Sequence, residues 1–187
     1  MPKKTPSKAK KESDKTNILD KINSNDALAI LKILCKEDMN IAKRIEQIAK
    51  KYLSGVDIDD IASEVYFDLD NIEVEEVWDR SGSTRDGYVD PGDMAWQMFE
   101  DALDPYLEEL KKYQNLSMHN EAKKYCMGIL KGIYQFEKES KSEYKVWAED
   151  APGEYFGQAL SGWKKGCKNP KDIEEMEEFV KKNFPDW

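Results

Sequence analysis

Apolar side chains recur three and four positions apart in one segment after another of this 187-residue chain. An α-helix turns once every 3.6 residues, so this spacing gathers the apolar side chains on one helical face. Two segments show it clearly, one with Ile58, Ile61, Ala62, Val65 and Leu69, the other with Tyr125, Cys126, Ile129, Leu130, Ile133 and Phe136. The pattern predicts an all-α protein whose antiparallel helical hairpins pack as a bundle or a short α-solenoid.

Capping residues divide this pattern into separate helices. Asp57 and Asp90 are good N-cap types, and Pro91 would occupy the first position of the longest helix. Asn169 followed by Pro170 predicts the start of the last helix in the same way. Gly55 can adopt the left-handed conformation that ends a helix.

Two features inside the helical segments oppose helix propensity. Pro105 lies within the segment 90–113, where it predicts a kink or a restart capped by Asp104. Gly128 and Gly132 lie four residues apart with no turn signal around them, so they share one flat face. Close approach of another helix would compensate for their low propensity, and the segment 90–113 is the nearest candidate.

Charge is distributed unevenly along the chain. Residues 1–16 hold six lysines against Glu12 and Asp14, a net charge of +4, which leaves −13 on the remaining residues. The first 16 residues have no apolar periodicity, so we expect a disordered basic tail ahead of one helical domain over residues 17–187. Such a tail keeps the chain in solution or makes weak, salt-sensitive contacts with nucleic acid.

Cysteine use and hydropathy indicate the compartment. Cys35, Cys126 and Cys167 are an odd, sparse set, as is usual where thiols stay reduced. The N-terminal residues lack the apolar stretch of a secretory signal, and no apolar run approaches the roughly 20 residues that a membrane span needs. We therefore expect a cytoplasmic protein without membrane contact.

The longest stretch without helical periodicity is residues 79–88, which follows a short turn at residues 74–78. Its glycines and charges predict an irregular surface loop. Polar side chains there could hold an anion or a carboxylate of a partner: Arg80, Ser81, Ser83, Thr84 and Arg85. In the alternative, the loop is a polar connector whose arginines pair with Glu76, Asp79 or Asp86.

Several phrases in a fixed order carry a family resemblance: EVWDRSG at 76–82, TRDGYV at 84–89, DPG at 90–92, YCMGIL at 125–130, and WA with DAP at 147–152. Over residues 25–165 the chain resembles the helical region that accompanies SWIM-type zinc fingers in some prokaryotic proteins. The resemblance implies a helical accessory domain and no particular activity. The finger itself needs a Cys-x-Cys pair and a Cys-x-His pair, which this chain lacks, so zinc binding does not carry over.

Reactive side chains are few. His119 is the only histidine, and it shares a predicted helix face with Cys126 without the further ligands that zinc needs. The neighbours of Cys126 are apolar, so we expect an inert core thiol. Ser81 and Ser83 lack the strand-turn-helix setting of a hydrolase nucleophile. We therefore expect no catalytic residue, no bound metal and no cofactor.

The sequence therefore favours a non-enzymatic helical interaction module with another protein as its partner. Two alternatives stay open. One is a regulatory protein that contacts nucleic acid through residues 1–16, and the other is an enzyme whose site is assembled only in three dimensions. Neither the partner nor the oligomeric state follows from the sequence.

Overall fold

The computed structural model describes residues 21–85 and 87–187, so the basic tail expected at residues 1–16 lies outside the described residues. The chain divides into two compact units, one that ends at Tyr52 and one that begins at Leu53. Whether residues 17–187 act as the single domain expected from the sequence stays a prediction.

The described part of the first unit, residues 21–52, is called the arm below. It holds α1 (Ser24–Glu37) and all but the last residue of α2 (Met39–Leu53). Asn23 caps α1 by accepting a hydrogen bond from the backbone N–H of Asp26 at 2.9 Å. None of the residues of α1 or α2 is buried.

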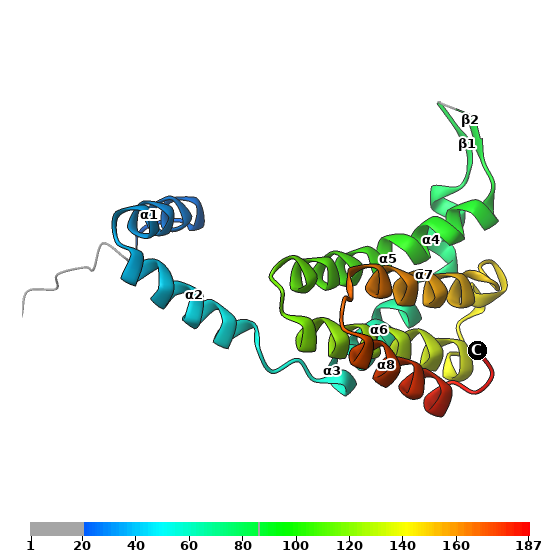
Figure 1. Cartoon of the computed structure of the whole chain (residues 1–187). Helices are drawn as coiled ribbons and strands as arrows, with labels where there is room; N and C mark the ends of the chain where they lie inside the picture. The colour runs from blue at the N-terminus through cyan, green and yellow to red at the C-terminus, as the bar shows by residue number, and fades with distance from the viewer. Residues whose placement is uncertain (1–20, 86) are drawn as a thin grey trace, which may run out of the picture. The chain divides into compact units, whose positions relative to one another are not determined.

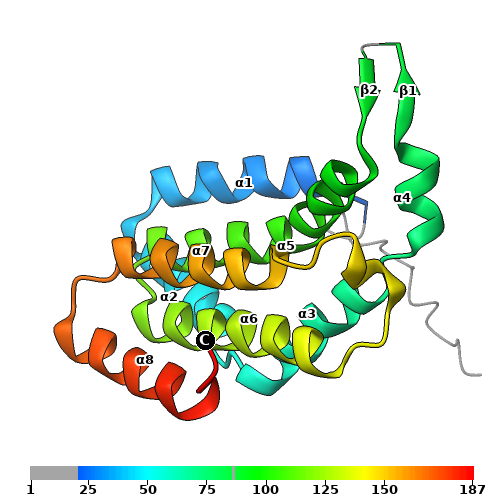
Figure 2. The ribbon, with the colours of Figure 1, turned by 90° about the vertical axis from the view of Figure 1, so that its right-hand side faces the viewer.

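The second unit, residues 53–187, is called the body. Its helices are α3 (Ile58–Asp70), α4 (Val74–Arg80), α5 (Pro91–Asn115), α6 (His119–Glu139), the short 3-10 helix η2 (Glu143–Val146), α7 (Ala151–Gly166) and α8 (Pro170–Asn183). Helix α6 is central and packs against α3, α5, α7 and α8, while α5 and α7 lie side by side (Figures 1 and 2). The body is therefore a helical bundle, and the predicted all-α class is confirmed.

The predicted caps form as expected. Asp57 accepts hydrogen bonds from two backbone N–H groups of α3, at 2.8 and 3.2 Å, and Asp90 accepts one from Gly92 at 2.8 Å. Gly55 has a φ of 95°, the left-handed value that suits a glycine after a helix. In each case a side chain or glycine satisfies a requirement that is local in sequence.

Two local expectations are corrected. Helix α5 continues through Pro105, so the chain does not restart at Asp104, whereas the alternative of a kink at Pro105 stays a prediction. A proline removes only one backbone donor, and the packing of a 25-residue helix on both sides of it outweighs that loss. Residues 74–80, predicted to begin as a short turn, form the helix α4.

Gly128 and Gly132 do mark a close helix contact, but the contacting helix is α3. A Cβ atom added at Gly128 would lie 2.6 Å from the Cβ of Ile61, and one at Gly132 would lie 2.7 Å from the backbone oxygen of Ala62. The expectation that the segment 90–113 covers this face is therefore wrong. The short connection makes α5 a neighbour of α6, but on another side of the helix.

In the part of the chain that the structure describes, no helix is both long enough and apolar enough to cross a membrane.

Candidate interaction surfaces

The residues singled out as a loop form a β-hairpin that projects from the body beyond the end of α4 (Figures 1 and 2). Strand β1 (Gly82–Thr84) pairs antiparallel with β2 (Gly87–Val89), and Ser83 lies opposite Tyr88. The expected irregular loop is therefore wrong. Gly87, which pairs with Thr84 next to the reversal, has a φ of 138°, and Gly82, at the start of β1, has a φ of 94°; only glycine adopts such values readily.

The two candidate arginines lie apart, Arg80 at the end of α4 and Arg85 after β1. The guanidinium of Arg80 donates to the carboxylate of Asp101 on α5 at 3.2 Å, with both side chains about half exposed. This carboxylate is none of the three that the sequence suggested. Arg85 follows the far end of β1, on the order of 15 Å of extended chain away. Whether Arg80, Ser81, Ser83, Thr84 and Arg85 hold an anion or a partner stays a prediction.

The tryptophans near the hairpin pack against the body. Trp78 meets Trp147 edge to face with ring centroids 4.9 Å apart, and Trp96 lies 6.2 Å from Tyr155. The first contact joins α4, which precedes the hairpin, to the segment before α7, and the second joins α5, which follows the hairpin, to α7. They suit a structural role better than a ligand cage.

Cys126 and His119 are not brought together as a reactive pair. Cys126 is fully buried, burial raises the pKa of its thiol, and its Sγ lies 3.9 Å from the carbonyl oxygen of Ala159. His119 instead lines a small hollow with Cys167 and Asp172. Among residues 21–85 and 87–187, no group of three or more His, Cys, Asp or Glu side chains is placed to hold a metal ion.

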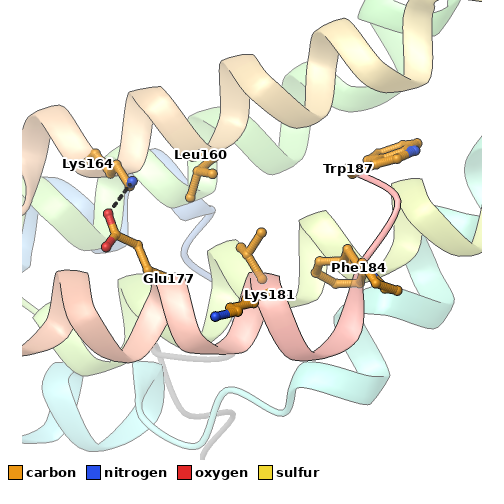
Figure 3. Close-up of a pocket in the computed structure, with 8 residues that line it drawn as sticks. Leu160, Lys164, Glu177, Lys181, Phe184 and Trp187 are labelled. Atoms are coloured by element: carbon orange, nitrogen blue, oxygen red, sulfur yellow. Dashed lines mark hydrogen bonds and ion pairs between the residues drawn. The ribbon is translucent and has the colours of Figure 1, made fainter.

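A groove of about 460 Å³ runs between α7 and α8 (Figure 3). Leu160 and Val180 form its apolar wall, and Phe184 and Trp187 close one end. At the other end Lys164 of α7 donates to Glu177 of α8 at 2.8 Å, an ion pair that ties the two helices together. The groove offers an apolar floor with charges at its edge.

An aromatic cluster fixes the closed end of this groove. The ring of Trp187 lies 4.7 Å from Phe156 and 5.4 Å from Tyr134, and Phe184 contacts both of the latter rings. Residues from α6 and α7 thus hold the segment after α8 in place. The closed end of the groove is therefore held by packing within the body.

The arm presents the most apolar exposed surface of the described residues, and the sequence reading did not single it out. Eight large apolar side chains in α1 and α2 are exposed: Leu28, Ile30, Leu31, Ile33, Met39, Ile41, Ile48 and Tyr52. The signal is present in the sequence, because Leu28, Leu31 and Leu34 recur at helical spacing, as do Ile41, Ile45 and Ile48. The spacing shows which face is apolar, but it does not show whether the rest of the chain covers that face.

Helix α2 is two-faced. Ile41, Ile45 and Ile48 share one side of a helical projection. Of the four basic side chains, Lys43 and Lys50 lie on the opposite side, and Arg44 and Lys51 lie along one edge of the apolar face. Glu46 is the only acidic residue in α2. Residues 1–52 carry a net charge of +6 and residues 53–187 a net charge of −15, so the two units are oppositely charged.

Comparison with known proteins adds no relative. No protein family, curated protein or solved structure matches the chain. The resemblance to the helical region that accompanies SWIM-type zinc fingers therefore stays a prediction.

Proposed function

We propose that this chain is a non-enzymatic, cytoplasmic protein-interaction module and that the arm is its main contact surface. One observation carries the proposal: α1 and α2 expose rows of large apolar side chains and contain no buried residue. Contiguous apolar surface of this kind marks interaction sites on soluble proteins. The helical spacing suits a partner that supplies a groove or further helices.

Energetics support a covered arm. Helices of 14 and 15 residues are marginal alone in water, because nucleation is costly and hydrogen bonds alone barely offset it. Burial of one large apolar side chain contributes about 1.5–3 kcal/mol. A partner that covers even half of the exposed rows would therefore stabilise both helices substantially.

The proposal is tested with the intact chain as bait and two variants at adjacent positions of α2. Ile48→Glu places a charge on the apolar face, and Gln47→Glu adds the same charge on the polar side. We expect specific partners to be retained by the wild type and by Gln47→Glu but lost by Ile48→Glu. Retention of the same proteins by all three baits would show that the arm is not the contact surface.

A second candidate is contact with nucleic acid through residues 1–16, and the basic side of α2 favours it. Four basic side chains along α2 would extend the lysines of the tail. Such binding should weaken steeply as salt rises, since phosphate contacts release counterions. Deletion of residues 1–16 should abolish it, and binding that survives both the deletion and high salt would exclude this candidate.

A further inference from the structure

Helix α1 has apolar side chains on so many sides that a single neighbouring helix cannot bury them all. From Ala27 to Cys35 only Lys32 is polar, so apolar side chains point in nearly every direction around the middle of the helix. A helix of this composition is normally surrounded by other helices. The apolar face of α2 can cover one side at most, because Lys43 and Lys50 lie opposite that face and Arg44 and Lys51 border it.

One face of α1 matches itself when it is reversed. Leu31 is the centre of this face on a helical projection. Leu28 and Leu34 lie three residues before and after it, and Ala27 and Cys35 lie four residues before and after it, so each pair is symmetric about Leu31 in angle and in distance along the axis. If two copies of α1 pack antiparallel with a two-fold axis at Leu31, each Leu28 lies level with Leu34 of the other copy. Each Ala27 then lies level with Cys35, small beside small. Such a self-matching surface is what a two-fold contact requires.

The charge of α1 does not oppose this contact. Asp26 and Glu37 balance Lys32 and Lys36, so α1 has no net charge, whereas α2 carries an excess of three positive charges. Two copies of α1 can therefore meet without repulsion. The two copies of α2 then lie outside, with their basic sides in water.

The exposed area is sufficient for a stable dimer. The eight large apolar residues of the arm are between 36 and 86% exposed. Five of the eight face the proposed contact: Leu28 and Leu31 on the two-fold face of α1, and Ile41, Ile48 and Tyr52 on the apolar face of α2. At roughly 100 Å² each they offer on the order of 500 Å² per chain, or about 1,000 Å² in total, the lower bound for a specific interface.

From these observations we infer that the arm is a dimerisation element: two chains join through an antiparallel contact between their α1 helices centred on Leu31, with α2 of each chain flanking the pair. The inference rests on the proposed function, since it names the partner of the same surface as a second copy of this chain.

The first test is the mass of the full chain in solution, measured by sedimentation equilibrium over about 1–100 µM. We expect twice the chain mass of 21.7 kDa. Leu31→Glu places two like charges at the two-fold axis and removes two buried leucines, so it should weaken dimerisation about 100-fold or more. Lys43→Glu, on the polar side of α2, should leave the dimer intact. Since the arm lies outside the core of the body, the body of each variant should unfold at the wild-type midpoint.

Salt distinguishes this contact from a charge-driven one. Each body carries −15, so the two bodies repel, and added salt should strengthen the apolar dimer. An association between the basic arm of one chain and the acidic body of another would weaken instead. A dimer that dissociates as salt rises therefore contradicts the inference.

Cross-linking tests the orientation. In the antiparallel arrangement, Ala27→Cys brings the new thiol level with Cys35 of the other copy, so mild oxidation should yield a covalent dimer. The wild type should not cross-link through the arm, because its two Cys35 residues would lie about 12 Å apart along the axis. Lys43→Cys serves as the control and should stay monomeric on a denaturing gel. Cross-linking of the wild type through Cys35 would indicate a parallel pair and overturn the arrangement.

The outcomes separate this inference from the proposed function. A wild type that stays monomeric up to about 100 µM overturns the inference, and the proposed function survives if Ile48→Glu still loses partners that Gln47→Glu retains. A dimer unaffected by Leu31→Glu assigns the interface to another surface and also overturns the inference. A monomer whose partners do not depend on the arm overturns both.

Discussion

Gly128 and Gly132 set how closely α3 and α6 can pack. The backbone oxygens of Ile58 and Ala62 lie 3.1 and 2.7 Å from the positions where Cβ atoms would stand at these two glycines. A side chain can rotate away from such a clash, but a helix backbone moves only as a whole. The two glycines therefore form a flat surface on α6 against which α3 packs. A side chain at either position would force α3 and α6 apart.

Gly132→Ala should lower the free energy of unfolding by about 1–3 kcal/mol, because overpacking outweighs the gain in helix propensity. Gly157, inside α7, is the control, since an added Cβ there meets no atom within 4 Å. Gly157→Ala should be neutral or stabilising by up to about 1 kcal/mol. Chemical denaturation of both variants measures the difference, and a stabilised Gly132→Ala would show that α3 does not sit on this face.

Sequence reasoning reached part of this contact. The spacing of Gly128 and Gly132 shows a flat helical face, which is a local property. Which helix covers the face depends on residues some 70 positions away. Nothing in the sequence around Ile61 and Val65 indicates that they contact the two glycines. Proximity in sequence favoured α5, and that choice was wrong for this reason.

At the scale of elements, one lysine joins α6 to α8. Lys123 donates to Asp172 at 2.7 Å and also to Glu175, and its side chain is only 11% exposed. Burial alone would lower the pKa of Lys123, but the two carboxylates outweigh burial and raise it. The hydrogen bond from Lys123 is the main reason that the pKa of Asp172 is lowered.

Lys123→Met keeps the apolar stem but leaves two carboxylates without their cation, so it should cost about 2 kcal/mol of stability. Lys131→Met, which removes an ion pair with the well-exposed Asp59, should cost less than about 1 kcal/mol. The folded pKa of Asp172 lies below its ordinary value of 3.8, so its contribution is complete above about pH 4 and is lost as the pH falls. Denaturant unfolding at pH 7 and pH 3 should show the penalty of Lys123→Met shrinking in acid; an equal penalty at both values would contradict this account.

The elements differ in how far the sequence revealed them. Caps such as Asp57 and Asp90 act within three residues, so the starts of α3 and α5 could be predicted. The β-hairpin could not be predicted from periodicity, because its strands have three residues each. The Asp86-Gly87 step and Gly82 were its only signals in the sequence.

At the scale of the whole molecule, the chain joins two units of different character. The body has a buried core of its own, whereas the arm has no buried residue among those described. Their net charges are −15 for residues 53–187 and +6 for residues 1–52. The charge contrast is visible in the sequence, but whether the apolar residues of a helix are covered depends on the fold, so the sequence pointed to the loop and not to the arm.

The central claim, that a second copy of this chain covers the arm, is tested most directly by hydrogen exchange of the backbone amides in the full-length wild type and in Leu31→Glu at the same concentration. Amides of α1 and α2 should be protected in the wild type and exchange at least about tenfold faster in the variant, while those of α6 stay equally protected in both. Arm amides that are equally protected in both proteins, or unprotected in both, would contradict the claim.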